Sequence, residues 1–205
     1  MTRSNFKLKI FFLINIFLLC LIATLSSEAS DAKNNLIVLG SDKAPVKIKI
    51  FSSFTCPHCA NFHFKVIPEI KREYVDRGKV QLIFIDFPLD QAAFNASKLL
   101  HCLDKNKQIN FMDTIYKNQN KWTAGNNIDE INNNLKNIVK DLGVNSTGFD
   151  NCLNNETIAD KILNERINGH KKYSIESTPT IVINEKKLDG SVNFKNIEKK
   201  IKKII

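Results

Sequence analysis

Cys56 and Cys59 are the residues best suited to chemistry, because two residues separate them within the stretch SSFTCPHCANFH. Such a pair can bind a metal ion, form an inert disulfide, or open and close as a redox centre. Zinc could take Cys56, Cys59 and His63, but a closed structural site needs a fourth ligand and usually a second close pair. An inert disulfide across so short a loop would restrain the unfolded chain little. The spacing therefore favours a redox centre.

The segments on either side of this pair predict where it lies. Val46 to Phe51 alternates apolar residues with lysine, as a half-buried strand does. After Cys56 an apolar residue recurs every four positions, which predicts a helix; its apolar residues are Phe62, Val66, Ile70 and Tyr74. Pro68 lies inside this helix and should kink it. We therefore expect the pair at a junction between a strand and a helix.

That junction predicts unequal roles for the two cysteines. Unpaired N–H groups and the positive end of the helix dipole would favour a thiolate at Cys56, the attacking cysteine. Cys59 is one turn further in, is better shielded, and suits the resolving role. Pro57 is tolerated at a helix start because its missing N–H would have no partner there. His58 would add positive charge or a hydrogen-bond donor and lower the pKa of Cys56 further. A low pKa makes the disulfide form a stronger oxidant.

The first 29 residues have the composition of a secretory signal peptide. A basic start (Arg3, Lys7 and Lys9) precedes an uncharged run from Ile10 to Leu25, and Ser27-Glu28-Ala29 offers a cleavage site. The run is shorter than the roughly 20 apolar residues of a spanning helix. We expect cleavage before Ser30 and export to the periplasm, with a retained N-terminal anchor as the alternative.

The remaining cysteines predict a second pair. The chain has five cysteines, and Cys20 would leave with the signal peptide. An even number in an exported protein suggests pairing, so Cys102 and Cys152 are expected to form a structural disulfide. Closing a loop of this length contributes roughly 4 kcal/mol in the chain-entropy model. Two buried free thiols are the alternative.

Composition and charge limit the class of protein. The chain is 43% hydrophobic and 25% charged, with a formal net charge of +9, which fits a globular domain. Lysines are concentrated in the tail, between Lys195 and Lys203, but they are not interleaved with aromatic residues. An exported chain with this pattern is not expected to bind nucleic acid.

The rest of the chain predicts an α/β core with an all-helical insertion. Residues 30–45 are expected to be extended, and Val80 to Ile85 is a second strand. Helices are predicted over Ala92–Leu103, Phe111–Gln119, Ile128–Leu142 and Ile158–Ile167. A hairpin follows, formed by Thr180–Ile183 and Lys187–Leu188 around a turn at Asn184–Lys186. A final helix has one apolar face, formed by Phe194, Ile197, Ile201 and Ile204.

A proline precedes the hairpin, in the sequence Ser177-Thr178-Pro179-Thr180. Pro179 removes a backbone donor at the start of a strand. A cis bond there would turn the backbone of Thr178 toward a neighbouring site, whereas a trans bond would make Pro179 an ordinary edge proline.

Together these segments resemble the DsbA-type thiol:disulfide oxidoreductases of the bacterial cell envelope. Similar segments occur in the same order: Ala44-Pro45-Val46, Phe51 to His63, Asp86 to Leu89, and Glu176 to Thr180. The resemblance implies a thioredoxin fold with an inserted helical domain. The corresponding domains are 1–29 (signal), 30–90 and 171–205 (the two parts of the thioredoxin fold), and 91–170 (the helical insertion).

The resemblance also implies residue roles and partners. Cys56 would be the nucleophile, Cys59 the resolving cysteine, and Pro179 a cis-proline whose neighbour Thr178 hydrogen-bonds the substrate backbone. The chain would donate its disulfide to thiol-containing exported proteins and be reoxidised by a quinone-linked membrane protein. No metal or organic cofactor is expected. The alternatives are a disulfide isomerase or reductase, or a non-catalytic binding protein with this fold.

Two features depart from the family pattern or leave the direction of reaction open. Many members have an acidic residue six positions before the first cysteine, where this chain has Ile50. Thr at the position of Thr178 occurs in both oxidase and isomerase branches. Only about 16 residues of the expected mature chain precede the first strand, too few for the dimerisation domain of the isomerases. This favours a monomeric oxidase.

Overall fold

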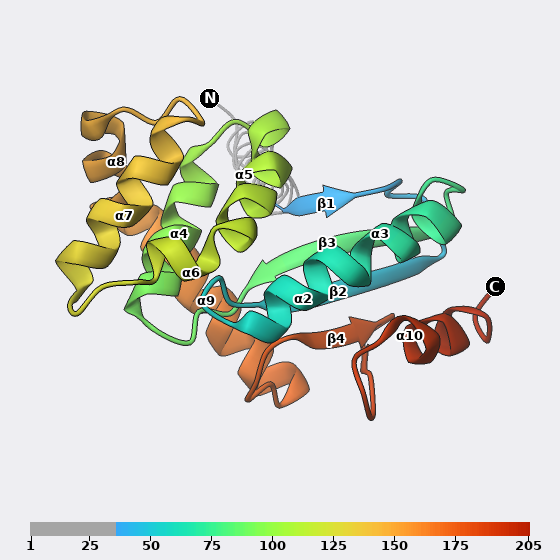
Figure 1. Cartoon of the computed structure of the whole chain (residues 1–205). Helices are drawn as coiled ribbons and strands as arrows, with labels where there is room; N and C mark the ends of the chain where they lie inside the picture. Colours follow the sequence, from blue (N-terminus) through green and yellow to red (C-terminus); the bar gives the residue numbers. More distant parts are fainter. Residues whose placement is uncertain (1–35) are drawn as a thin grey trace, which may run out of the picture. The chain divides into compact units, whose positions relative to one another are not determined.

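The computed structural model describes residues 36–205, and the predicted signal peptide lies outside them. Ile37–Ile205 form one compact unit. Its five-stranded sheet has the order β1-β3-β2-β4-β5 (Figure 1). β2 and β3 are parallel, and the other neighbours are antiparallel. The strands are β1 (Ile37–Leu39), β2 (Val46–Ser52), β3 (Val80–Asp86), β4 (Thr180–Ile183) and β5 (Lys186–Lys187).

Helices occupy most of the remaining chain. Between β2 and β3 lie α2 (Pro57–Lys65), α3 (Ile67–Ile70) and a π-helical turn, η1 (Lys71–Val75). A block of helices separates β3 from β4, and α10 (Phe194–Ile201) follows the hairpin. The helices of the block are α4 (Gln91–Cys102), α5 (Lys105–Lys117), α6 (Gln119–Trp122), α7 (Ile128–Lys140), α8 (Ser146–Leu153) and α9 (Glu156–Tyr173). No helix among residues 36–205 is long and apolar enough to cross a membrane.

Successive side chains of β2 point to opposite faces of the sheet, and different helices cover the two faces. Ile48 and Ile50 are buried on the face that packs against α2, α3 and α10. Phe51 is on the other face, where it packs with Phe87 and Ile175 near the C-terminal end of α9. Gly169 of α9 lies so close that a Cβ there would be 2.7 Å from the Phe51 ring. The end of α9 therefore rests on the sheet beside β2.

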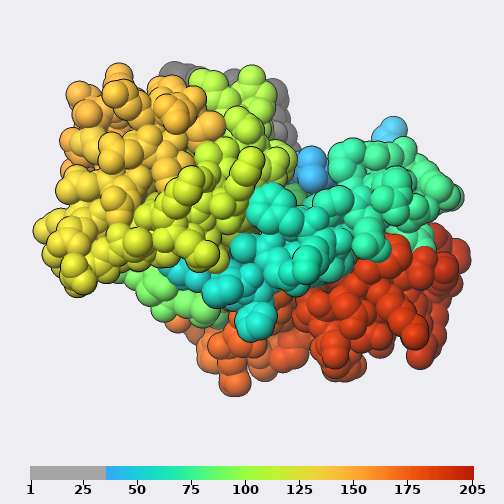
Figure 2. All heavy atoms as spheres, in the orientation of Figure 1, coloured from blue at the N-terminus to red at the C-terminus, as the bar shows by residue number. Residues whose placement is uncertain are grey.

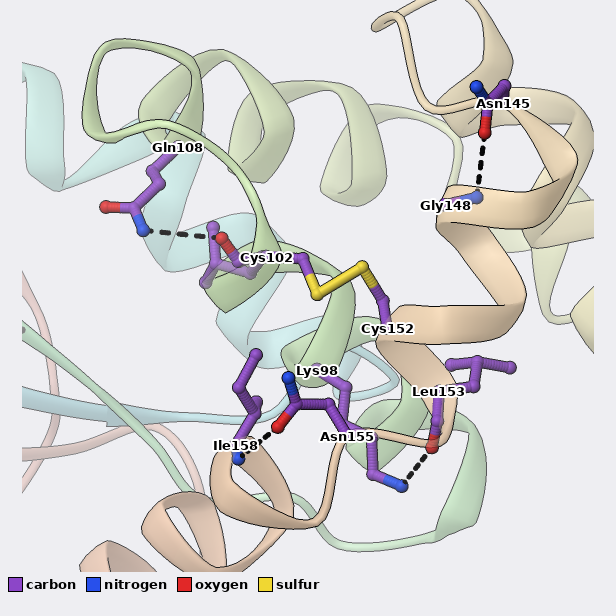
Figure 3. Close-up of a disulfide and its surroundings, with 10 residues drawn as sticks. Lys98, Cys102, Gln108, Asn145, Gly148, Cys152, Leu153, Asn155 and Ile158 are labelled. Atoms are coloured by element: carbon purple, nitrogen blue, oxygen red, sulfur yellow. Dashed lines mark hydrogen bonds between the residues drawn. A yellow bond between two sulfur atoms is a disulfide. The ribbon is translucent and has the colours of Figure 1, made fainter.

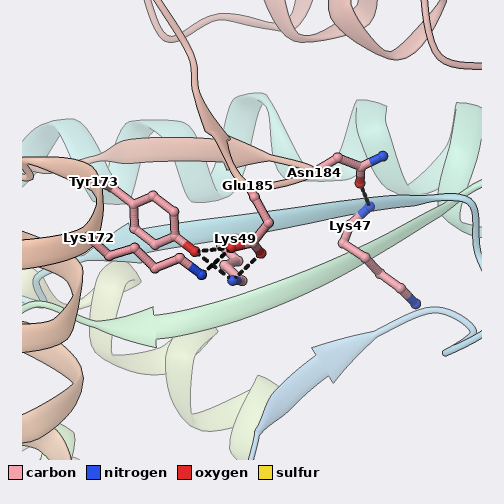
Figure 4. Close-up of polar contacts among 6 residues, drawn as sticks. All are labelled: Lys47, Lys49, Lys172, Tyr173, Asn184 and Glu185. Carbon is pink, nitrogen blue, oxygen red and sulfur yellow. Dashed lines mark hydrogen bonds and ion pairs between the residues drawn. The ribbon is translucent and has the colours of Figure 1, made fainter.

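The lysines of β2 lie on this second face. Lys49 Nζ donates to the Tyr173 hydroxyl at 2.8 Å and pairs with Glu185 (Figure 4). Glu185 also accepts from Lys172, and the hydrogen bonds from Lys172, Lys49 and Tyr173 lower the pKa of Glu185 to about 2. Asn184 and Glu185 both have positive φ, 42° and 68°, as a two-residue type I′ hairpin turn requires. The side chain of Glu185 thus connects the hairpin turn to α9.

The helix after Cys56 is interrupted as Pro68 predicts. α2 ends at Lys65, Val66 caps it, and Pro68 lies in the first turn of α3. Proline has no N–H for the preceding turn, and its ring clashes with the carbonyl four residues earlier. The predicted apolar residues, from Phe62 to Tyr74, are all buried. This prediction is confirmed.

Other boundaries differ from the predictions. β1 is a strand because it pairs with β3, although residues 30–45 were expected only to be extended. α8 was not predicted, α9 runs further in both directions than Ile158–Ile167, and the predicted Phe111–Gln119 helix is divided between α5 and α6. β5 is Lys186–Lys187 rather than Lys187–Leu188, because the turn has two residues instead of three. The predicted domain boundaries at 90/91 and 170/171 stay predictions.

Asparagine side chains start several of these helices. Each accepts a hydrogen bond from a backbone N–H of the first turn, which would otherwise lack a partner. The residues are Asn127, Asn145, Asn155 and Asn193, at the starts of α7, α8, α9 and α10. The abundance of Asn in the chain therefore has structural use in the helical block.

Candidate active site

Cys56 lies where the strand–helix junction predicts, at the N-cap of α2. Its sulfur accepts a hydrogen bond from the backbone N–H of Cys59 at 3.4 Å. Pro57 occupies the first turn of α2, where no donor is required. In the space-filling view, the turquoise surface of α2 lies between the yellow-green α5 and α6 and the red C-terminal segment (Figure 2). The redox pair is thus at the N-terminus of a helix that lies between the helical block and the C-terminal segment.

The two thiols have opposite electrostatic surroundings. A hydrogen bond from the Cys59 thiol is the main cause that lowers the pKa of Cys56 to about 5, against the opposing effect of burial. The Thr178 side chain and the backbone N–H groups of Cys59 and His58 lower it further. The same Cys56 contact, together with burial, raises the pKa of Cys59 well above that of an ordinary thiol. Cys56 is therefore the thiolate of the pair and Cys59 the protonated thiol.

The segment before β4 faces Cys56. The Thr178–Pro179 peptide bond is cis, and Cys56 Sγ lies 3.3 Å from the Thr178 carbonyl oxygen, to which it donates only when protonated. Thr178 is buried, and its hydroxyl has no hydrogen-bond partner among the described residues. That hydroxyl is thus free to donate to a thiolate at Cys56.

The histidines near the pair behave differently from one another. His58 is exposed, and its backbone N–H acts on the Cys56 sulfur. His63 is buried, and its Nε2 lies 2.6 Å from Asp113 Oδ1. The His63 ring packs against Tyr116, with 5.0 Å between ring centroids. His63 is thus a packed histidine, and it does not converge with the two cysteines as a zinc site would require.

The helical block holds the turn that precedes Cys56, which sequence reasoning missed. The Gln119 side-chain amide donates to the carbonyl oxygens of Phe54 and Cys56, at 2.7 and 3.1 Å. Thr55 and Ser53 form further connections. The Thr55 hydroxyl donates to Asp90 at the start of α4, and Ser53 Oγ accepts from the Leu89 backbone N–H. No sequence signal distinguishes Gln119 from the other glutamines, because its contact depends on how the helices pack on the core.

A buried polar cluster lies at the end of β3. His101 Nε2 is 2.6 Å from Asp86 Oδ2, and Ser97 donates to the other oxygen of Asp86. Burial raises the pKa of Asp86, but His101, Ser97 and Lys161 together outweigh it and the net shift is downward. Asp86, His101 and Glu165 are the described residues whose spacing could suit a metal ion. The ammonium of Lys161, 3.3 Å from His101 Nδ1, already supplies positive charge there.

Cys102 and Cys152 are joined as a disulfide between the end of α4 and α8 (Figure 3). Their Cα atoms are 6.0 Å apart, and the two residues are 50 positions apart in sequence. Lys98 of α4 donates to the Leu153 carbonyl at 2.7 Å, and Asn145 caps α8 by accepting from Gly148 N. The disulfide therefore fastens α8, a short helix, to the core of the helical block.

Comparisons with known proteins agree with this fold. A family model described as Thioredoxin matches residues 32–203. The probable disulfide bond formation protein D of Bacillus cereus is 29% identical over 219 residues, covering 98% of this chain and 100% of its own length. The corresponding Bacillus anthracis protein is 31% identical over 173 residues, covering 80% and 78%. The crystal structure of Wolbachia pipientis alpha-DsbA1 is 31% identical, with a TM-score of 0.74 over 83% of this chain and 90% of that one.

The chain belongs to the thioredoxin family and, within it, to the DsbA-type proteins. The predicted fold, a thioredoxin fold with a helical insertion, is confirmed. The predicted activity class is confirmed as well: the chain is a thiol:disulfide oxidoreductase that acts on thiol-containing proteins.

Proposed function

We propose that this chain is an oxidase, which donates a Cys56–Cys59 disulfide to exported proteins. The observation that carries the proposal is the asymmetry of the pair: the pKa of Cys56 is lowered to about 5, whereas that of Cys59 is raised. A stabilised thiolate favours the dithiol form of the protein, and so makes its disulfide a strong oxidant.

The proposed reaction has two exchange steps. A client thiolate attacks Cys56 Sγ, the Cys56–Cys59 bond breaks, and Cys59 leaves and takes up a proton. A second client thiolate then attacks the client sulfur of the mixed disulfide. This releases Cys56 as a thiolate, forms the client disulfide and leaves two electrons on the protein. Cys56 suits this step because a thiol of low pKa is a good leaving group.

The neighbouring residues would hold the client in place. Thr178 presents its backbone beside Cys56, next to the cis Pro179. An extended client segment would form backbone hydrogen bonds with Thr178 while its cysteine reaches Cys56. The burial of Cys56, which is only 7% exposed, then restricts attack to thiols that approach along this segment.

Reoxidation and location complete the proposal. A quinone-linked membrane protein would accept the two electrons and restore the disulfide. The chain would work as a monomer in the periplasm, after removal of residues 1–29 or attached by them. Neither step needs a metal or an organic cofactor, because sulfur atoms carry all the bonds that form and break.

Equilibration with glutathione buffers tests the direction of the reaction. Thiol trapping with mass readout would report the fraction of Cys56 and Cys59 that is reduced. A potential near the roughly −120 mV of DsbA would support an oxidase. A potential near the roughly −270 mV of thioredoxin would instead indicate a reductase.

A further inference from the structure

A groove lies beside the exchange site, where α9 passes the loop between β3 and α4. Its volume is about 420 Å³. Phe87 and Leu89 line it from the loop after β3, Arg166 and Ile167 from α9, and Ile175 and Glu176 from the segment before Thr178. The groove is therefore built from three segments that meet at the end of the sheet where Cys56 lies.

Apolar side chains are exposed at this groove. Leu89 is 48% exposed and Ile167 is 44% exposed, above a floor that includes the buried Phe87 and Ile175. Exposed large apolar residues that gather around a concavity mark surfaces that bind other molecules. Leu163, 42% exposed and one turn earlier on α9, does not line the groove.

The charged groups at the groove are mostly basic. The Arg166 guanidinium lies over the Phe87 ring, 5.3 Å from its centroid, and Lys171 also lines the groove. Among residues 36–205, neither cation has an ion-pair partner. Glu176 contributes one negative charge on the side of Thr178. Two unpaired cations against one carboxylate favour an acidic ligand.

The groove is continuous with the exchange site on both sides. The Leu89 backbone N–H donates to Ser53 Oγ at 3.3 Å, in the turn that leads to Cys56. On the other side, Glu176 is two residues before Thr178, whose carbonyl oxygen contacts Cys56 Sγ. An extended chain advances about 3.3 Å per residue. A client bound along Thr178 would therefore reach the groove within a few residues of its cysteine.

We propose that this groove binds an apolar side chain of the client, a few residues from the reacting cysteine, with an acidic residue beside it. The proposal rests on the proposed function and names its substrate class. Ile167, Leu89 and Phe87 would cover the apolar side chain, and Arg166 and Lys171 would attract the acidic one. Unfolded exported proteins supply such segments, because their apolar residues are not yet buried.

Four peptides test this substrate preference. Each has two cysteines and differs only at two neighbouring positions, which are Leu-Glu, Leu-Lys, Ser-Glu or Ser-Lys. Rates of oxidation by the disulfide form are divided by the rate for dithiothreitol, a thiol too small to reach the groove. The ratio should be highest for Leu-Glu, about tenfold above Ser-Lys. Equal ratios for all four peptides would overturn the groove proposal while leaving the oxidase proposal intact.

Matched variants test whether the groove causes this substrate preference. Ile167→Asn should remove the preference for Leu over Ser, whereas Leu163→Asn, on the same helix and equally exposed, should keep it. Lys171→Glu should reverse the preference from Glu to Lys. Equal losses in Ile167→Asn and Leu163→Asn would contradict the groove. If the unmodified protein oxidised neither peptides nor dithiothreitol, the proposed function itself would be wrong, and the groove's role with it.

A separate observation concerns Gln119. Its side chain is 7% exposed and donates to two carbonyl oxygens that flank the turn before Cys56. The Cys56 carbonyl also accepts from Ala60 N at 3.2 Å, in the first turn of α2. One amide from the helical block thus connects α6 to both ends of the segment that positions the sulfur.

We infer that Gln119 is a positioning residue, which holds Cys56 at the N-terminus of α2 and beside Thr178. Without its amide, the Phe54 carbonyl would be buried with no donor, and the turn would relax to recover one. The sulfur would then move away from the N–H groups that lower the pKa of Cys56.

Gln119→Met tests this role, because it removes the donor at similar volume. We expect the pKa of Cys56, followed by thiolate absorbance, to rise by about one unit, which is a tenfold change in the ionisation equilibrium. Gln108→Met is the matched control, since Gln108 is also buried and donates to a carbonyl, that of Leu100 beside Cys102, rather than to the turn before Cys56. It should lower the melting temperature without changing the pKa of Cys56.

If Gln119 had a purely structural role, Gln119→Met would have the same effect as Gln108→Met. In that case the melting temperature would fall and the pKa of Cys56 would stay constant, which would overturn the inference. Gln119→Glu gives a second reading if the Met variant does not fold. It keeps the shape of the side chain but places a carboxylate against the two carbonyl oxygens, and it should raise the pKa of Cys56 further.

Discussion

The two cysteine pairs of this protein consist of the same side chains, but their surroundings differ. Cys56 and Cys59 lie at one helix end, where a hydrogen bond and backbone donors stabilise a thiolate on one sulfur only. Cys102 and Cys152 come from two helices of the block, where the neighbouring polar groups bond to one another instead. Cys102 is even the most exposed of the four. Exposure therefore does not decide which pair reacts; stabilisation of one thiolate does.

The two pairs also make different contributions, one to disulfide exchange and the other to the stability of the fold. The Cys56–Cys59 loop is too short to restrain the unfolded chain, so its disulfide is free to serve in exchange. The Cys102–Cys152 loop is long, so its disulfide stabilises the fold and has no reason to open.

The largest expected effect comes from removing the attacking sulfur. Cys56→Ser should lower the rate of dithiothreitol oxidation by more than about a thousandfold, because the disulfide can no longer form. The fold should remain, since Ser is a good helix N-cap. Stopped-flow measurement of exchange would check this, with circular dichroism as the control for folding. A rate within tenfold of the unmodified protein would place the chemistry elsewhere.

Removing the second pair should change stability instead of exchange. The double variant Cys102→Ala with Cys152→Ala should lose about 4 kcal/mol of unfolding free energy, as the chain-entropy model gives for a loop of this length. Urea denaturation would measure the loss. The rate of dithiothreitol oxidation at room temperature should be unchanged, and a large fall in that rate would mean that the two pairs are coupled.

The pH dependence of stability should distinguish the dithiol form from the disulfide form. The pKa of Cys56 is about 5 in the fold, below the roughly 8.5 of an unfolded thiol. Between these values the unfolded state binds more protons, so stability rises with pH. The contribution should be complete above about pH 8.5 and should disappear as the pH falls through about 5.

Urea midpoints measured between these two pH limits would show this rise. The disulfide form has no thiol to titrate and is the control. Parallel curves for the two forms would contradict the low pKa of Cys56.

The smallest effect is expected near the structural pair. Asn145→Ala removes the N-cap of α8, the helix that carries Cys152, and should cost about 1 kcal/mol of unfolding free energy. Asn151→Ala, at an exposed position inside the same helix, should change stability by less than half of that. Exchange should be unaffected in both. An equal loss in the two variants would mean that the cap does not support α8.

The sequence alone predicts those elements whose pattern is local. The alternation in Val46–Phe51, the apolar repeat from Phe62 to Tyr74 and the kink at Pro68 all depend on neighbouring residues, and all are present in the structure. β1 has three residues, too few for a pattern, and becomes a strand only by pairing with β3. α8 contains a glycine and few apolar residues, so its helical state depends on its cap and on the disulfide.

Contacts between distant segments could not be predicted in this way. Gln119 lies 63 residues from Cys56, and its role depends on how α6 packs against the turn. Asp86 and His101 belong to a strand and a helix whose relative placement no local pattern fixes. Their contact, with His101 Nε2 at 2.6 Å from Asp86 Oδ2, therefore appears only in the structure.

The short strand β5 has a further consequence for a protein that handles unfolded chains. It ends the sheet with two exposed residues, Lys186 and Lys187, after which the chain leaves the strand. An open strand edge is a template on which another extended chain can pair and aggregate, and short, lysine-rich edges oppose this. An unfolded client therefore meets few backbone partners at this edge, and is less able to remain attached there after its disulfide has formed.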